Sequence, residues 1–309
     1  PAGLSTPFAS WTDAVGSRVI APARARHRCL QVFHGTRERI DPEWQEALAQ
    51  LGLGDLNNWR SPVEVPPVSV SKIVTACYRV PLAGGRVIYY KRYDYSRVVK
   101  DRLGFWLRPS KAGVEQFGYG RYRSLGIAVP RIVGFGESRV LGTLTAAFIA
   151  TEEVPSAVPL SDFVRDTVSA ESDSERSRKL RAFAGRLLGD LHKAHAASLF
   201  HYDLRWRNIL IQQRGGEYYP VIIDCPRAFV SRLRRRYGIT ADLSALARDA
   251  LPYLTLYQRY RLLAAYLGES AGPAERKSWF RRVQRRLERR ASLREQPRDS
   301  LLQGVRFDL

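Results

Sequence analysis

The chain lacks methionine altogether and has only three cysteines among its 309 residues. Cys29, Cys77 and Cys225 are scattered without the spacing of a metal site, and their odd number argues against a disulfide framework. No apolar run reaches the roughly 18–20 residues that a membrane-spanning helix needs, and no basic-then-apolar signal pattern opens the chain. These absences predict a globular protein of the reducing cytoplasm.

Acidic residues are scarce relative to basic ones. The chain has 30 Asp and Glu against 50 Lys and Arg, which gives a formal net charge of +20. Such a field attracts polyanions, whether nucleic acid, an anionic membrane face or a phosphorylated glycolipid, and charge alone does not choose among them. The hydrophobic content of 45% is typical of a folded protein, and the length favours a two-lobed one.

The chain divides into three expected parts. Residues 1–65 are expected to be an N-terminal extension packed on the first lobe, with one helix beginning at Asp41-Pro42. Residues 66–155 have mostly strand patterns, and residues 156–309 have mostly helical ones. The expected elements are strands at 68–70, 73–80, 87–93, 132–136 and 144–151, two strands around Gly215-Gly216, and helices at about 110–124, 180–191, 241–250, 253–267 and 275–294.

The most informative stretch runs from His201 to Asp224. Asp203 follows His201 by two residues, Asn208 follows Asp203 by five, and Asp224 ends the second of two short apolar strands. Phosphoryl transfer from ATP needs such a set: one carboxylate near the attacking hydroxyl, and an amide with a second carboxylate for Mg²⁺. The alternative is a hairpin whose polar residues only cap turns, but the four positions would then coincide by chance.

The order of these residues resembles the protein-kinase catalytic loop, H-x-D-x-x-x-x-N, followed by the aspartate of the D-F-G motif. Only the aspartate of that second motif is present, because Cys225-Pro226 follows it. The corresponding fold is α+β and bilobal, with a small β-rich N-lobe and a mainly helical C-lobe.

Two further residues suit a kinase nucleotide site. Lys91 lies on an apolar strand after a hairpin, where a kinase has the lysine that binds the ATP phosphates. Glu115 is the only acidic residue between Asp101 and Glu137, so it is the expected helix partner of Lys91. The alternatives are a solvent-facing lysine and a surface pair of Glu115 with Lys111.

The covering loop of a kinase is absent, since the segment from Ser69 to Tyr78 has no glycine. Lys72, or backbone amides near Ser71, are the expected phosphate contacts in its place. Glu152 and Glu153 end the apolar strand where the chain would cross between lobes, and adenine is expected to bond to backbone there.

Basic residues gather in two places. Arg232, Arg234, Arg235 and Arg236 follow the metal aspartate, where kinases bind the acceptor, although solvated arginines are the plain alternative. The last expected helix has an apolar stripe of Trp279, Val283 and Leu287 and a face of arginines. That helix suits an anionic membrane surface, and the alternative is a stripe that packs on its own lobe; the two can coexist.

With these residues in view, the chain resembles the lipopolysaccharide core kinases, the Kdo/WaaP (InaA-like) family of the protein-kinase-like fold. The resemblance covers roughly residues 71–267. It depends most on the stretch from His201 to Asn208 and less on three shorter ones. These are Tyr90-Lys91-Arg92-Tyr93, 126–130 with 134–137, and Ile223-Asp224 followed by Arg227-Ala228.

The resemblance implies ATP-dependent phosphorylation of a heptose or Kdo hydroxyl in the inner core of lipopolysaccharide. The enzyme would be cytoplasmic, peripheral on the inner membrane of a Gram-negative cell. The glycolipid and the anionic membrane are then the expected partners, nucleic acid is not, and the need for a protein partner stays open.

The expected roles are those of a kinase. Asp203 orients and deprotonates the acceptor hydroxyl, and Arg205 neutralises charge on the transferring phosphoryl group. Asn208 and Asp224 hold Mg²⁺, while Lys91, positioned by Glu115, holds the ATP phosphates.

Two rival functions remain at this point. One is a kinase of protein or of a small molecule such as an aminoglycoside, which the basic run disfavours because an aminoglycoside is itself cationic. The other is a non-catalytic kinase-fold protein that binds membrane or nucleic acid. Such a protein would have no need to keep Asp203, Asn208 and Asp224 together.

Overall fold

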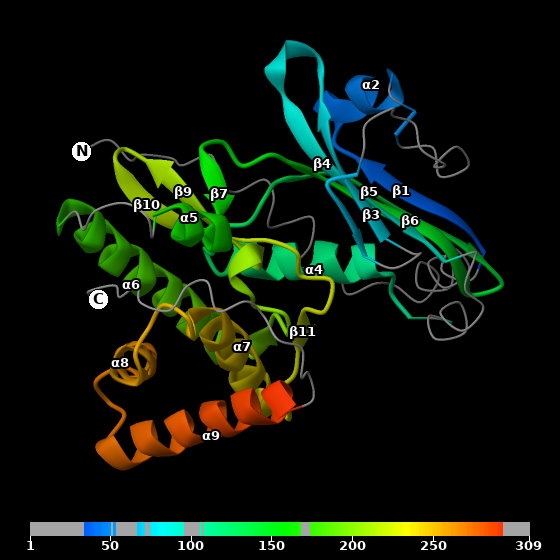
Figure 1. Cartoon of the computed structure of the whole chain (residues 1–309). Coiled ribbons are helices and arrows are strands. Elements are labelled where there is room, and N and C mark those ends of the chain that lie inside the picture. Colours follow the sequence, from blue (N-terminus) through cyan, green and yellow to red (C-terminus); the bar gives the residue numbers. More distant parts are fainter. Residues whose placement is uncertain are drawn as a thin grey trace, which may run out of the picture.

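The computed structural model describes residues 34–50, 52–53, 67–71, 75–95, 106, 108–167 and 174–292. These residues form a sheet-rich part and a helical part, joined across helix α4 (Figure 1). The bilobal α+β fold expected from the sequence is therefore confirmed. The boundaries at residues 65 and 155 stay a prediction.

The first part is a six-stranded antiparallel sheet in the order β1-β5-β6-β4-β3-β2. Helix α4 runs between this sheet and the helical part, whereas α2 lies on the other side of the sheet (Figure 1). The elements are β1 (Gly35–Ile40), α2 (Pro42–Gln50), β2 (Ser69–Ser71), β3 (Thr75–Pro81), β4 (Val87–Asp94), α4 (Lys111–Ser124), β5 (Ile132–Val140) and β6 (Thr143–Glu152).

Successive side chains of β4 point to opposite faces of the sheet, so the two faces contact different parts of the protein. Ile88 and Tyr90 pack with Trp44 of α2 in one buried cluster, and Tyr93 belongs to the larger cluster that continues into the helical part. Lys91 lies on the same face as Tyr93, toward α4. The strand period thus aims the lysine into the space between the lobes.

The second part consists mainly of helices, with two small sheets at its junction with the first. The helices are α5 (Leu160–Thr167), α6 (Ser174–Ala196), α7 (Arg235–Ala250), α8 (Leu256–Leu267) and α9 (Pro273–Ser292). One sheet has the order β10-β9-β7 and the other β11-β8. Their strands are β7 (Ala157–Pro159), β8 (Leu199–Phe200), β9 (Ile209–Arg214), β10 (Glu217–Ile222) and β11 (Phe229–Val230).

The observed elements differ from the expected ones at several points, β1 and α7 among them. Strand β1 was not expected, because five of its six residues are exposed and polarity hides the strand period; it is an edge strand that pairs with β5. Helix α7 begins at Arg235 instead of 241, since its first turn is a run of arginine and tyrosine that gives no apolar stripe.

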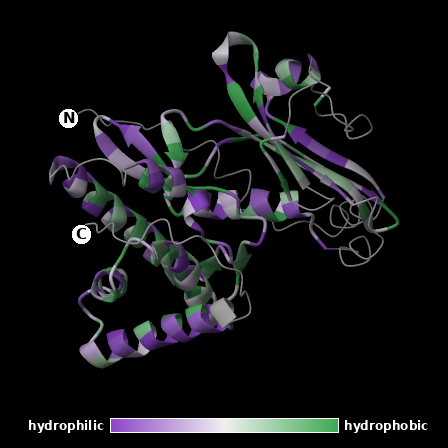
Figure 2. Ribbon diagram, in the orientation of Figure 1, coloured by the Kyte–Doolittle hydropathy of each residue, from purple (hydrophilic) through white to green (hydrophobic). Residues whose placement is uncertain are grey.

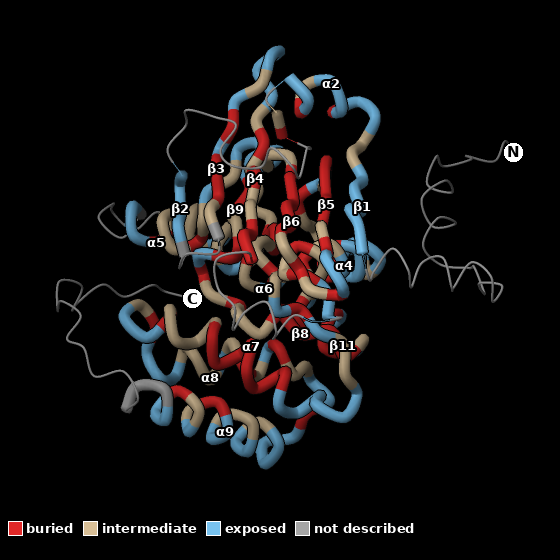
Figure 3. The backbone as a smooth tube through the Cα atoms, turned by 90° about the vertical axis from the view of Figure 1, so that its right-hand side faces the viewer, coloured by how far each residue is buried: buried red, intermediate tan, exposed pale blue. Residues whose placement is uncertain are grey.

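The sequence of α9 did not decide whether its apolar stripe packs on its own lobe or faces a membrane, and the structure decides this. Val283 and Leu287 are buried, and Trp279 and Phe280 pack against the main core. The opposite side of the helix is hydrophilic and exposed (Figures 2 and 3). The apolar stripe therefore packs on its own lobe, and only the cationic face is left for an external partner.

Candidate active site

Lys91, Glu115 and Asp224 meet between the two lobes. Lys91 Nζ donates to Glu115 Oε1 at 2.7 Å and to Asp224 Oδ1 at 2.8 Å. Burial opposes the charge of the lysine, but the two carboxylates outweigh it and hold the pKa of Lys91 well above its usual value. Burial likewise opposes the charge of Asp224, and Lys91 keeps the pKa of that carboxyl below its usual value. Lys91 and Asp224 are thus both charged at neutral pH.

Two tyrosines fix Glu115, which is fully buried. Tyr93 Oη donates to Oε2 at 3.2 Å, and Tyr119 Oη donates to Oε1 at 2.8 Å. Tyr119 Oη also accepts from the backbone N–H of Asp224 at 2.9 Å. Burial raises the pKa of both phenols, so they stay protonated donors. From sequence, Tyr93 was noted without a role and Tyr119 was not selected, although Tyr119 follows Glu115 by one helical turn.

Helix α4 lies unusually close to the segment after Asp224. A Cβ at Gly118 would be 2.7 Å from Cys225 Sγ and 2.9 Å from the Cβ of Ala228. Cys225 is buried there, and its thiol donates to the carbonyl of Glu115 at 3.6 Å. Asp224 itself has φ of 56°, in the region that favours glycine. The segment that replaces D-F-G is therefore held by direct packing on α4.

The loop from His201 to Asn208 is ordered by its own hydrogen bonds. His201 is buried; its Nε2 donates to the carbonyl of Ile223 at 3.0 Å, and its Nδ1 accepts from the N–H of Asp203 at 3.3 Å. Asn208 Nδ2 donates to the carbonyl of Asp203 at 2.8 Å. These bonds connect the segment of Asp203 to the residues that follow strand β10 and lead to Asp224.

Asp242 of α7 holds the same loop through its carboxylate. Its carboxylate accepts from the backbone N–H of His201 at 2.8 Å and of Tyr202 at 2.7 Å, and it contacts His195 Nε2 at 3.3 Å. Tyr202 has φ of 61°, so the loop turns sharply just before Asp203. Asp242 was not among the residues predicted from sequence. The signal that could have identified it is its position as an acid inside a buried helical stretch.

Asn208 and Asp224 suit a hard cation. The described residues contain no cluster of three His, Cys, Asp or Glu side chains that could hold a metal. Because the amide nitrogen of Asn208 is bonded to Asp203, its side-chain oxygen is left for a ligand role. One amide and one carboxylate oxygen fit Mg²⁺, which commonly takes its remaining ligands from phosphates and water.

Arg205, predicted to neutralise charge on the phosphoryl group, is paired inside the chain. Its guanidinium pairs with the carboxylate of Asp249 in α7, with Nε at 2.9 and 2.7 Å from the two oxygens, and the N–H of Trp206 donates to the same carboxylate at 2.8 Å. Arg205 thereby fixes the loop from His201 to Asn208 to helix α7. The exposed Arg207 contacts Asp203 instead, with Nη2 at 3.3 Å from Oδ2.

At the end of β6, where adenine was predicted to bond to backbone, two N–H groups already donate to carbonyls of the chain itself. The N–H of Glu152 donates to the carbonyl of Arg131 and that of Glu153 to Val87, both at 2.9 Å. The Glu153 carboxylate pairs with Arg79 at 2.7 Å. The side chain of Glu153 is thus directed to the sheet surface. Lys72 lies outside the described residues.

The basic run after β11 leads into the first turn of α7. Arg232, Arg234, Arg235 and Arg236 are all exposed. Leu233 among them has a relative exposure of 101%. Helix α7 has neither a side-chain cap nor an acidic residue in its first turn, so the positive end of the helix carries extra positive charge.

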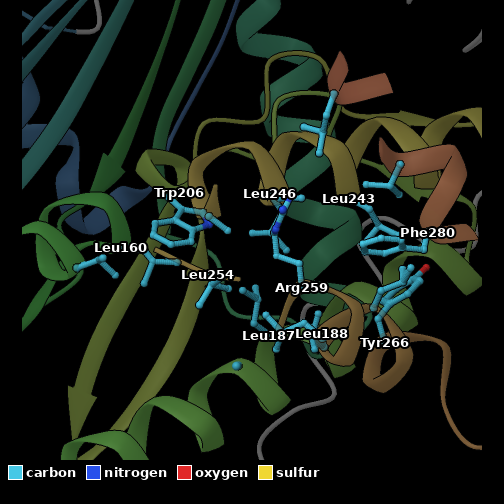
Figure 4. A pocket seen from close by; sticks show the side chains of 18 of the residues that line it. Leu160, Leu187, Leu188, Trp206, Leu243, Leu246, Leu254, Arg259, Tyr266 and Phe280 are labelled. Atoms are coloured by element: carbon cyan, nitrogen blue, oxygen red, sulfur yellow. The ribbon is translucent and has the colours of Figure 1, made fainter. Parts of the chain in front are cut away.

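A separate apolar cavity of about 160 Å³ lies inside the helical part. Side chains from α5 to α9 surround it, and Trp206 brings it next to the catalytic loop (Figure 4). Arg259 is the charged residue in its lining, and the Nε of Arg259 is buried without a hydrogen-bond partner among the described residues. Burial lowers the pKa of this arginine.

A sheet-bearing lobe with a lysine–glutamate pair, opposite a helical lobe with an H-x-D-x-x-x-x-N loop, defines a phosphotransferase of the protein-kinase-like fold. The chain belongs to the lipopolysaccharide kinase (Kdo/WaaP) family, whose sequence model matches residues 74–266. This match confirms the family resemblance seen in the sequence.

The fold has a solved counterpart. A structure described as WaaP in complex with acyl carrier protein superposes with a TM-score of 0.58 at 20% identity, covering 82% of this chain and 98% of that one. No curated protein matches the sequence. None of the helices that the structure describes is long and apolar enough to cross a membrane.

Proposed function

We propose that this chain transfers the γ-phosphoryl group of Mg²⁺-bound ATP to a heptose or Kdo hydroxyl of the lipopolysaccharide inner core. The observation that carries the proposal is the bridge from Lys91 Nζ to Glu115 at 2.7 Å and to Asp224 at 2.8 Å. A kinase needs this pair and this carboxylate in place together. Membership of the family supports the glycolipid as the acceptor.

In this mechanism the protein acts mainly by positioning and by charge. Asp203, whose carboxylate is about a third exposed, accepts the hydroxyl proton of the acceptor. Lys91 binds the ATP phosphates, and Asn208 with Asp224 holds the metal. Mg²⁺, when bound, neutralises charge on the phosphates. Lys72 stays proposed as a phosphate contact, and the chain around Glu152 and Glu153 as the adenine contact.

Arg207 replaces Arg205 as the proposed partner of the transferring phosphoryl group. It contacts Asp203 and also lowers the pKa of Asp224 by its charge, so it lies near both carboxylates. Replacing Arg207 with Gln is expected to lower kcat about tenfold or more, with little change in KM for ATP. Arg121→Gln, on the exposed surface of α4, is the matched control. An unchanged kcat in steady-state assays would rule out this role.

The proposed reaction is tested by transfer of ³²P from labelled ATP to purified core lipopolysaccharide from which phosphate has been removed. Wild-type enzyme should label the glycolipid, and Lys91→Ala should not. Label on protein or on an aminoglycoside, with none on the glycolipid, would point to the rival kinases. ATP binding without any transfer would point to another acceptor.

We further propose that the enzyme meets its acceptor at an anionic membrane surface through the basic run at the start of α7. Leu233 is fully exposed between Arg232 and Arg234, an arrangement suited to the headgroup region. Leu233→Ser is expected to weaken binding to phosphatidylglycerol vesicles several-fold in sedimentation assays, whereas Leu251→Ser should not. Equal binding by both variants and wild type would contradict this contact.

An acyl carrier protein is the proposed protein partner. The similar WaaP structure contains one, and the apolar cavity in the helical part of this chain has the lining that an acyl chain requires. Ala247→Trp should fill the cavity and reduce co-purification with acylated carrier protein while leaving ATP binding intact. Retention of the acylated carrier protein by this variant would argue against an acyl chain in the cavity.

A further inference from the structure

The hydroxyl of Tyr202 has no evident purpose in the site described so far. Its ring lies 6.0 Å from both the Phe200 and the Tyr237 rings, and its oxygen is buried without a hydrogen-bond partner among the described residues. Leaving a buried hydroxyl unpaired costs free energy. Such a group is therefore a candidate for binding something that the folded chain itself does not supply.

Arg286 of α9 has a second unpaired donor nearby. Its guanidinium lies over the Tyr237 ring, 4.8 Å from the centroid, and Nη2 contacts Tyr237 Oη at 3.4 Å. Its Nε is buried and, within the part of the chain that the structure describes, has no hydrogen-bond partner. Tyr202 and Arg286, each with one unpaired donor, thus both contact Tyr237.

The charged neighbours of the Tyr202 hydroxyl are one carboxylate and two arginines. Burial raises the pKa of Tyr202, Asp242 adds to this effect, and Arg234 and Arg286 oppose it, which makes both arginines electrostatic neighbours of the phenol. The hydroxyl accordingly stays a donor at neutral pH. Arg234 also stands at the start of α7, whose first turn has no acidic residue. The carboxylate of Asp242 already accepts the N–H groups of His201 and Tyr202. Two unpaired donors beside two arginines remain, and such a group can bind an anion.

We propose that Tyr202, Arg234 and Arg286 form a subsite for a phosphate group carried by the acceptor. The proposal rests on the proposed function, because it names a part of the acceptor. Tyr202 immediately precedes Asp203, so a phosphate held here fixes the acceptor relative to the catalytic carboxylate. The subsite would thereby select which sugar hydroxyl reaches Asp203, and it would give α9 a direct part in substrate recognition.

Binding of phosphate is tested apart from catalysis. The enzyme is saturated with a non-hydrolysable ATP analogue and Mg²⁺, and its melting temperature is followed as inorganic phosphate is added at constant ionic strength. Phosphate should stabilise wild type and Arg121→Gln, and should not stabilise Tyr202→Phe or Arg286→Gln. Equal stabilisation of all four proteins overturns the subsite. So does a large drop in the melting temperature of Tyr202→Phe without phosphate, since its hydroxyl would then be structural.

Recognition of the acceptor is tested by kinetics with deacylated, water-soluble core acceptor. Tyr202→Phe should raise KM for a phosphorylated acceptor about tenfold, as expected for a lost hydrogen bond to a charged group, and leave kcat and KM for ATP unchanged. The difference from wild type should vanish with a dephosphorylated acceptor. A higher KM only in the presence of phosphatidylglycerol vesicles would assign the anion to a membrane headgroup and overturn the proposal. If wild type transfers nothing, the proposed function fails, and the phosphate titration still decides the subsite.

Discussion

Asp203→Asn is expected to lower turnover by about 10²–10⁴-fold, the usual contribution of a general base, and to leave ATP affinity nearly unchanged. Asparagine keeps the size of the side chain and the backbone bonds of residue 203 to His201 and Asn208. It cannot accept the proton of the acceptor hydroxyl. Single-turnover transfer measures the first effect, and calorimetric titration with an ATP analogue and Mg²⁺ measures the second.

Measuring transfer and ATP binding separately shows in which way the assignment of Asp203 as the general base could be wrong. Near-normal transfer by Asp203→Asn would move the base to another residue. Loss of ATP binding would mean that Asp203 belongs to the metal site instead. Asp166→Asn, on an exposed turn of α5, is the control and should behave as wild type.

Asp242→Ala is expected to be the most destabilising change near the site. The carboxylate is only 1% exposed and accepts the backbone N–H groups of His201 and Tyr202. Truncation leaves the buried N–H of His201 and the half-buried N–H of Tyr202 unpaired, at about 1–3 kcal/mol for each buried donor. For a chain of this size the melting temperature should fall by roughly 5–10 °C, measured by differential scanning calorimetry.

Loss of activity should accompany this loss of stability, because Asp242 holds the turn that presents Asp203. Asp166→Ala is the stability control, since its carboxylate is largely exposed and surface pairs contribute little. A melting temperature of Asp242→Ala equal to that of the control would contradict the structural role given to Asp242.

The local part of this site could be predicted from sequence. Spacing within one segment selected Asp203 and Asn208, and the scarcity of acidic residues selected Glu115 as the partner of Lys91. The structure brings Lys91 and Glu115 to 2.7 Å. Strand alternation and helical period determine which face each side chain occupies. A pair such as Lys91 and Glu115 can therefore be predicted from the spacing of residues in the sequence.

The supporting contacts could not be predicted in this way. Asp242 and Asp249 reach the catalytic loop from a helix some 40 residues further along the chain, and no local pattern reports a tertiary contact of this kind. Arg205 was assigned to the substrate because its position in the loop was known and its partner Asp249 was not. The stripe of α9 had the same ambiguity, since lobe and membrane both cover apolar side chains.

The most direct measurement is tandem mass spectrometry of the core glycan after reaction with ATP and Mg²⁺, with Asp203→Asn as the blank. One added phosphate is expected on a heptose or Kdo residue, with the wild-type enzyme alone. Phosphate found elsewhere on the glycolipid, or in the same amount with Asp203→Asn, would contradict this expectation.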